Sequence, residues 1–212
     1  MDKKDSIYSA SLTGCGFMVD EMTAILPLLM CENPELKLKK EVIENNYLHI
    51  NSQTTRSRAV SEFKKRYNSL TREFWEHYIE LDHKNQVLAM FYVMLKAYPI
   101  LFDLHFDVTV KKWASVAQII TKGDVLNGIY TIEAKDEFVA SWSNLTKNKL
   151  SSAFITILKK TGLIKNSKGE LQQVPYQNLD FSYYVRNGEL WFLEACLLYP
   201  YQINELKDKV AL

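Results

Sequence analysis

The stretch LTKNKLSSAFITILKKTGLIKNSKGELQQV, residues 145–174, carries the strongest indication of the fold. Its first half predicts a helix, because apolar residues recur on one stripe at helical spacing. These residues are Leu150, Ala153, Phe154, Ile157 and Leu158. Gly162 is placed to end the helix. The following GLIKNSKGELQQV alternates apolar and polar residues around an Asn-Ser-Lys-Gly turn, which predicts a small β-hairpin.

The residues before this stretch extend the pattern. Segments 122–134 and 136–142 predict two short helices, so the order is two helices, a third helix and a hairpin. That order is typical of a winged helix-turn-helix unit, in which the third helix enters a groove of DNA and the hairpin lies beside the duplex. The alternative is a solvated helix followed by an ordinary hairpin.

The predicted third helix has an outer face whose chemistry suits nucleic acid. Amide and hydroxyl groups can hydrogen-bond to base edges, and ammonium groups can contact phosphates. The residues proposed for these contacts are Lys147, Asn148, Lys149, Ser152, Thr156 and Lys159. The turn of the hairpin would project Lys165, Asn166 and Lys168 beside the duplex.

The formal net charge of +1 conceals two basic segments. Residues 51–72 and residues 141–170 each hold six basic residues against one acidic residue, a local charge of +5. The remainder of the chain holds 14 basic and 23 acidic residues, a charge of −9. Near-neutrality is therefore a cancellation, and it does not argue against a polyanionic partner.

The first basic segment predicts a helix that follows Ser52 and ends near Asn68. Val60, Phe63 and Tyr67 would form its buried stripe, with a basic face on the opposite side. The residues proposed for phosphate contacts are Arg56, Arg58, Lys64, Lys65 and Arg66. An ordinary solvated face is the alternative, because no base-reading side chain accompanies them.

The composition favours helices throughout. Only 7 Gly and 5 Pro occur in 212 residues, too few turn residues for a β-sandwich or barrel. We therefore expect a mainly α fold, with a helical bundle over residues 1–107 and a winged-helix-like domain with closing helices over residues 108–212. The apolar run at residues 87–106 is interrupted by Lys96, Pro99 and Asp103, which predicts a buried core hairpin rather than a membrane span.

Signs of catalysis or of a cofactor are poor. The TGCG at residues 13–16 lacks the Gly-Lys-Ser/Thr ending of a phosphate-binding loop. His105 with Asp103 and Asp107 is the one compact cluster that could hold a metal, and a buried hydrogen-bonded histidine is the favoured interpretation. We expect no catalytic residue, metal or cofactor. The three cysteines lack CxxC spacing, which favours free thiols in a reducing cytoplasm.

Four blocks of sequence resemble a known family. They are YSASLTGCGFM (residues 8–18), SRAVSEFKKRYNSL (57–70), FYVMLKAYPILFDLHFDVTVKKW (91–113) and GELWFLEACLL (188–198). Together they resemble the BrxA family, a small component of the BREX bacteriophage-exclusion systems of bacteria. The resemblance runs from Tyr8 to about Leu198, and no catalytic motif is among its blocks.

This resemblance implies a soluble, mainly helical, two-part protein with similarity to the NusB antitermination fold. It also implies binding to double-stranded DNA and action beside the other BREX proteins, which include a DNA methyltransferase, a phosphatase-like protein and ATPases. It supplies no set of DNA-binding residues, so the residues named above rest on charge and spacing.

The expected function is that of a non-enzymatic accessory protein that binds double-stranded DNA with little sequence specificity. Low specificity is expected because the second basic segment offers lysines rather than bidentate arginines. Two alternatives stay open: a scaffold that assembles other BREX components, and an RNA-binding protein of NusB type. A metal-dependent enzyme ranks behind both.

Overall fold

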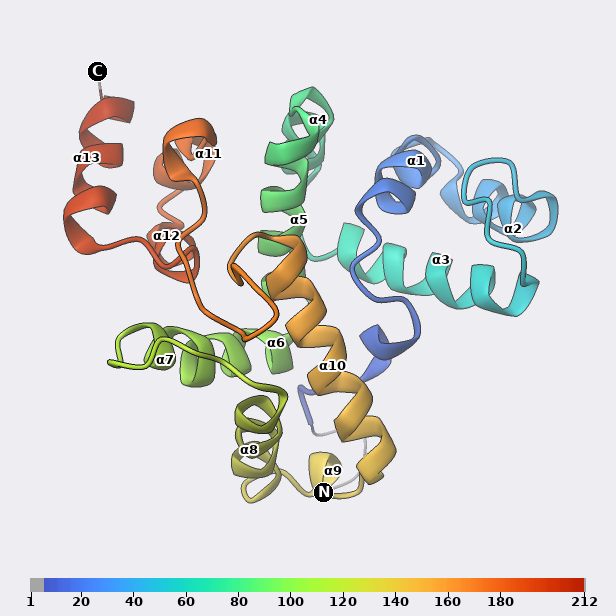
Figure 1. Cartoon of the computed structure of the whole chain (residues 1–212). Helices are drawn as coiled ribbons and strands as arrows, with labels where there is room; N and C mark the ends of the chain where they lie inside the picture. Colours follow the sequence, from blue (N-terminus) through green and yellow to red (C-terminus); the bar gives the residue numbers. More distant parts are fainter. Residues whose placement is uncertain (1–5, 212) are drawn as a thin grey trace. The chain divides into compact units, whose positions relative to one another are not determined.

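The structure is a computed structural model that describes residues 6–211, and it is mainly helical (Figure 1). It divides into two compact units, one of residues 9–98 and one of residues 6–8 with 99–211. The boundary predicted at residue 107 lies inside the second unit. Each unit is described by itself below.

The first unit consists of helices. In chain order they are η1 (Ser11–Gly14), α1 (Val19–Leu29), α2 (Pro34–Glu44), α3 (Gln53–Tyr67), α4 (Arg72–Glu80) and α5 (His83–Ala97). Of these, α3, α4 and α5 each begin at a residue whose side chain caps the helix. Ser52 accepts the backbone N–H group of Thr55, so the predicted start of α3 is confirmed, and Asp82 caps α5 in the same way by accepting the N–H group of Asn85.

The core of the first unit forms around α5. Every residue from Leu88 to Leu95 is buried, which explains the long apolar run in the sequence. Phe74, Trp75 and Tyr78 of α4 pack beside it, and the Trp75 indole N–H donates to the Tyr67 carbonyl at 2.9 Å. Each large side chain that is fully buried contributes about 1.5–3 kcal/mol to the free energy of folding.

The second unit begins with one helical segment built from α6, a π-helix and α7. Its elements are α6 (Pro99–Leu104), η2 (His105–Val110), α7 (Lys111–Trp113), α8 (Lys122–Glu133), α9 (Glu137–Ala140), α10 (Asn144–Lys160), η3 (Tyr176–Asn178), α11 (Ser182–Arg186), α12 (Leu190–Ala195) and α13 (Pro200–Ala211). The closing helices expected at the end of the second domain are present as α11, α12 and α13.

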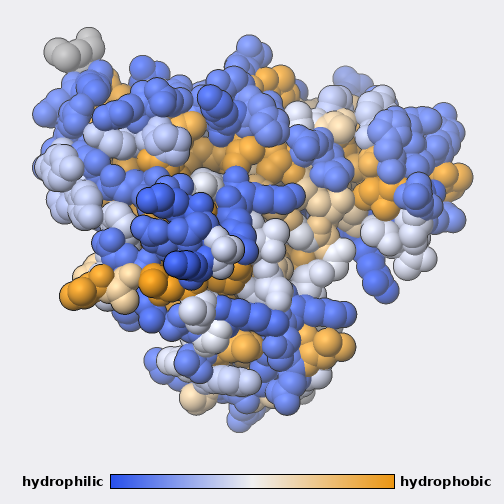
Figure 2. Space-filling view, in the orientation of Figure 1, coloured by the Kyte–Doolittle hydropathy of each residue, from blue (hydrophilic) through white to orange (hydrophobic). Residues whose placement is uncertain are grey.

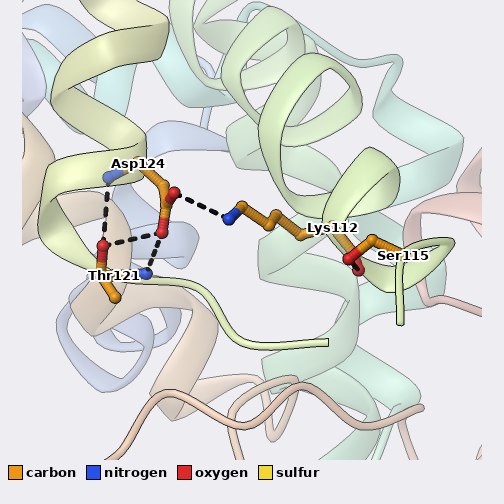
Figure 3. Close-up of polar contacts among 4 residues, drawn as sticks. All are labelled: Lys112, Ser115, Thr121 and Asp124. Atoms are coloured by element: carbon orange, nitrogen blue, oxygen red, sulfur yellow. Dashed lines mark hydrogen bonds and ion pairs between the residues drawn. The ribbon is translucent and has the colours of Figure 1, made fainter. Parts of the chain in front are cut away.

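The start of α8 is tied to the end of the preceding helical segment (Figure 3). Thr121 caps α8 by accepting the Asp124 N–H, and the Asp124 carboxylate accepts the Thr121 N–H at 2.8 Å. Lys112 of α7 then contacts the same carboxylate at 2.9 Å. These contacts fix where α8 starts, and α10 packs on α8.

The predicted hairpin after α10 is not formed, because residues 6–211 contain no β-strand. Two isolated antiparallel bridges join Ile164 to Leu171 and Ile119 to Glu170. The backbone N–H groups of Leu163 and Ile164 donate to the Leu158 carbonyl at the end of α10, so they are not available to extend a ladder. The winged helix with a β-hairpin is therefore not supported, although its order of helices is present.

Across residues 6–211, no single helix is long and apolar enough to cross a membrane. The consecutive helices His83–Ala97 and Pro99–Trp113 reach that length and apolarity only when they are taken together across the break between them.

Candidate nucleic-acid interface

The exposed side of α10 carries most of the residues proposed to contact DNA. Stepping 100° per residue from Asn148, the side chains of Lys149, Ser152, Thr156 and Lys159 fall within an arc of about 100°. Asn148 is half-buried and the other four are exposed. The structure thus brings these five residues together on one side of a single helix, as predicted.

Three of these polar side chains use their donors within the helix. Asn148, Ser152 and Thr156 donate to the carbonyl oxygens of Asn144, Asn148 and Ser152, respectively, at 2.9–3.0 Å. Their side-chain oxygens still have lone pairs that can accept hydrogen bonds. This stripe is therefore suited to accept from the amino groups of cytosine or adenine, and the flanking lysines are suited to phosphates.

Lys147 is placed differently from the rest of the set. Its side chain is 5% exposed, and its ammonium contacts the Glu133 carboxylate of α8 at 2.6 Å. It also lies 5.7 Å from the centroid of the Tyr130 ring. The prediction that it contacts phosphate is wrong for this conformation. Its spacing of three and seven residues from the buried Leu150 and Phe154 already indicated an inward position.

The turn after α10 projects Lys165 and Lys168 into solvent. Asn166 organises this turn, since its carboxamide oxygen accepts the Lys168 N–H at 3.0 Å and its backbone carbonyl accepts the Gly169 N–H at 3.1 Å. Lys165 lies 3.7 Å from the Glu170 carboxylate, with both side chains about half exposed or more. The two lysines are therefore displayed as predicted, on a turn rather than on a β-hairpin.

Gly169, the last residue of the predicted Asn-Ser-Lys-Gly turn, is required by the backbone at this position. Its φ is +83°, and a β-carbon at this position would collide with the carbonyl oxygen of Ile120. The backbone N–H of Ile120 donates to the Gly169 carbonyl at 2.9 Å. A glycine at the end of an Asn-Ser-Lys-Gly turn was the available signal.

The C-terminal end of α10 adds one cation that was left out of the predicted set. Lys160 is exposed beside Lys159, and it follows the same polar face. Among the described residues, none forms an ion pair with Lys149, Lys159, Lys160 or Lys168. We define the α10 surface as these four lysines together with Lys165, Asn148, Ser152 and Thr156. This surface is consequently a site of positive charge that acidic residues largely leave unpaired.

The first basic segment, on α3, does not form a comparable surface. Arg56 is 7% exposed, and its guanidinium donates to the carbonyl oxygens of Val42, Ile43, Ile50 and Asn51. These bonds satisfy the end of α2 and hold the connection to α3. A helical projection puts Arg56 about 40° from Val60, on the buried stripe, so this position was readable from the spacing.

Arg66 is fully buried, and the prediction that placed it on an exposed face is wrong. Its guanidinium donates to the backbone carbonyls of Gly16 and Phe17 and to the Tyr98 hydroxyl. Tyr98 in turn donates to the Glu62 carboxylate at 2.7 Å. The projection failed here because a second set of neighbours, the backbone of residues 16–17 and Tyr98, covers that side of α3.

The remaining cations of α3 are partly compensated. Lys64 pairs with the Glu35 carboxylate, and Lys65 lies 4.3 Å from the centroid of the Tyr98 ring. Burial lowers the pKa of Lys65. Arg58 is exposed and has no ion pair among the described residues. Among the described residues, Arg58 is thus the one cation of α3 that is both exposed and without an ion pair, and the charge count alone overstated the capacity of this segment to bind phosphate.

The histidine considered as a metal ligand is buried, as favoured from the sequence. The Nε2 of His105 bonds to the Ala195 carbonyl at 2.7 Å, and burial lowers its pKa to about 4. Asp103 accepts the Tyr8 hydroxyl at 2.6 Å, and Asp107 pairs with Lys111 at 2.6 Å. Within residues 6–211, no group of three potential ligands is arranged to hold a metal ion.

A family model for BrxA matches residues 6–183, which include α10 and the following turn. The chain belongs to the BrxA family. This BrxA-family chain is 23% identical over 184 residues to the BREX protein BrxA of Bacillus cereus (strain H3081.97). The aligned region covers 86% of the chain and 92% of that relative. Membership places it among the components of BREX phage defence.

A solved structure shares the fold of this BrxA-family chain. It is the crystal structure of an uncharacterized protein from Magnetospirillum magneticum, with a TM-score of 0.72 and 20% sequence identity. The match covers 90% of the chain and 98% of the solved one. At this identity the likeness concerns the fold.

Proposed function

We propose that this BrxA-family protein binds double-stranded DNA through the α10 surface, as a non-enzymatic accessory of BREX defence in the cytoplasm. One observation carries the proposal: five lysines and an aligned row of hydrogen-bond acceptors lie on one helix and its turn, and Glu170 is the one carboxylate of the described residues that pairs with them. Polyanion binding is the chemistry that such a surface supports best.

The expected contacts are mainly to phosphates. Lysine is a point charge that contacts phosphate without the fixed fork geometry that arginine uses to read guanine. Acceptor oxygens on Asn148, Ser152 and Thr156 can add weak discrimination between bases. We therefore expect affinity that falls steeply with salt and varies little with sequence.

The test compares two charge-reversed variants of the whole protein. K149E/K159E/K168E alters the α10 surface and leaves the structural Lys147 in place. The control, K37E/K39E/K84E, makes the same change in net charge at exposed lysines of α2 and α5. Duplex binding is measured by fluorescence anisotropy at low salt, and folding is checked by circular dichroism.

We expect the α10 variant to bind duplex DNA at least about tenfold more weakly than the wild type. The control should stay within about threefold, because exposed charges that are not part of the binding surface act only through a screened long-range field. Equal losses in both variants would contradict a localised interface. Unchanged binding by the α10 variant would remove α10 from the proposal.

A second function is favoured by one separate observation. Leu36 and Ile43 of α2 are 72% and 68% exposed, and they lie two helical turns apart on the same side. Figure 2 shows apolar surface over α2. Exposed apolar patches mark protein contacts, so α2 would dock another BREX component.

The variant L36E/I43E tests this second function in cells that carry the whole defence cluster. Other BREX components should then fail to co-purify with the variant, and its binding to duplex DNA should persist.

A competition experiment between structured RNA and duplex DNA distinguishes RNA binding from the two functions above. A preference of the wild type for structured RNA over duplex DNA would favour the NusB-type alternative.

A further inference from the structure

An aromatic groove of about 570 Å³ lies beside the turn that carries Lys165 and Lys168. Its walls come from the end of α7, the segment 170–177 and the start of α13. The lining residues used below are Trp113, Gln118, Lys165, Gln177 and Tyr201. The α10 surface and this groove belong to the same unit of the chain.

Three aromatic rings form a row whose two ends, Trp113 and Tyr201, line the groove; the first pair of rings is tilted by 31° and the second pair is stacked. The centroids of Trp113 and Tyr199 are 5.5 Å apart, and those of Tyr199 and Tyr201 are 6.0 Å apart with an interplanar angle of 12°. Tyr201, the outermost ring, is 66% exposed. The row therefore ends on an open aromatic surface, and such a surface is what an unpaired base stacks on in proteins that bind single strands.

Gln118 and Gln177 are two of the glutamines that line the groove, and only the first is held by a side-chain hydrogen bond among the described residues. Gln118 has a φ of +45°, an unusual value for a residue other than glycine, and its Nε2 donates to the Trp113 carbonyl at 2.9 Å. Gln177 is exposed, and among the described residues it has no side-chain hydrogen bond. Its carboxamide can therefore donate to and accept from the edge of a base.

The rim supplies positive charge for the phosphates on either side of such a base. Lys165 is paired with Glu170 at 3.7 Å, and the two side chains are 60% and 47% exposed. An exposed pair of this kind contributes little to stability, so a phosphate can replace the carboxylate at little cost. Lys168 projects from the same turn.

An exposed apolar side chain lies on the loop next to the groove. Val116 is 105% exposed, and the bridge between Ile119 and Glu170 holds its loop against the lysine turn. Figure 2 shows an apolar projection at the loop that follows α7. Apolar side chains at such positions can enter a base step and favour an unstacked nucleotide.

From the stacked rings, the free carboxamide and the cationic rim, we infer that the aromatic groove binds an unpaired nucleobase of a DNA strand that continues from a duplex on the α10 surface. This inference rests on the proposed duplex binding and names the form of DNA that it favours. The preferred ligand is then a duplex with a single-stranded tail or an extruded base.

The test uses the full chain and three fluorescent DNA probes: a blunt duplex, the same duplex with a short thymidine tail, and a thymidine oligonucleotide alone. The wild type should bind the tailed duplex at least about fivefold more tightly than the blunt one, as one stacked base contributes about 1–3 kcal/mol. Y201L should lose that gain and bind the blunt duplex normally, and Y201F should keep it. Y47L, at an exposed tyrosine of the first unit, is the matched control.

The possible outcomes separate the two proposals. No gain from the tail, or a gain that persists in Y201L, would overturn the groove and leave duplex binding standing. Failure to bind the blunt duplex, with Tyr201-dependent binding of the thymidine oligonucleotide, would overturn duplex binding and keep the groove. Tighter binding of a uridine oligonucleotide than of thymidine would overturn the assignment to DNA.

Discussion

Arg58 and Arg66 lie about two turns apart on α3 and have opposite roles in the structure. Arg58 is exposed, whereas the Arg66 guanidinium is enclosed by the carbonyls of residues 16–17 and the Tyr98 hydroxyl. Arg66 matters for stability, because removing its buried guanidinium leaves these acceptors without a donor.

We predict that R66M lowers the free energy of unfolding by about 3 kcal/mol or more, and that R58M changes it by less than about 0.5 kcal/mol. Urea denaturation followed by circular dichroism measures both. Equal stability of the two variants would contradict the structural role of Arg66. R58M also shows whether α3 contributes to DNA binding without disturbing the fold.

His105 predicts a pH dependence of stability. Burial lowers its pKa to about 4, whereas the side chain of an unfolded chain has a pKa of about 6.5. Between these values the unfolded state takes up a proton that the folded state does not. The free energy of unfolding therefore falls as pH drops through this window, by about 2 kcal/mol between pH 7 and pH 5, and His105 contributes no change above pH 7.

The variant H105Q isolates this effect, because glutamine can still donate to the Ala195 carbonyl and does not titrate. Its stability should be lower than that of the wild type at pH 7 and should fall less between pH 7 and pH 5. Thermal denaturation at a series of pH values gives the comparison. The same loss in both proteins would assign the dependence to other groups.

At the scale of elements, the turn after α10 depends on Gly169. We predict that G169A destabilises the protein by about 1–3 kcal/mol, since alanine is strained at a φ of +83° and its β-carbon would collide with the Ile120 carbonyl. The matched control is G188A, which has a similar φ of +71° and open space around it. Thermal melts should show a larger loss for G169A, and the reverse order would contradict the close approach.

The contact between α8 and α10 gives a second prediction at this scale. K147E should lower the free energy of unfolding by about 2–4 kcal/mol, because it places a carboxylate against Glu133 in a partly buried site. K149E, two residues away on the exposed side, should change stability by less than about 0.5 kcal/mol and should weaken duplex binding. A K147E protein with native stability and impaired DNA binding would show that Lys147 reaches the phosphate after all.

At the scale of the whole molecule, the α10 surface predicts the salt dependence of binding. Each phosphate neutralised adds about −0.9 to the slope of log K against log salt, so five lysines set a limit near −4 to −5. The variant K149E/K159E/K168E should reduce the magnitude of that slope by about 2–3. Anisotropy titrations over a range of salt concentrations measure it, and an unchanged slope would place the phosphate contacts elsewhere.

The basic segments could be located from the sequence, and so could the helices that carry them. The Ser52 cap and the spacing of Leu150 and Phe154 involve residues that are close together in the chain, so a sequence pattern can show them. The prediction of a β-hairpin was wrong because the alternation of apolar and polar residues around the turn is also compatible with two isolated bridges. The N–H groups of Leu163 and Ile164, which a β-ladder would need, instead donate to the carbonyl of Leu158 at the end of α10.

Local pattern thus establishes the family resemblance, the mainly helical character and the two basic segments, because each depends on residues that are near one another in the chain. Which cations meet solvent is a property of the packed molecule. The helical spacing of Arg56 and Lys147 already indicated their inward positions, but Arg66 is enclosed by the carbonyls of residues 16–17 and the Tyr98 hydroxyl, which are distant from it in the sequence. Burial is set by every neighbour of a helix, and a charge count includes none of them.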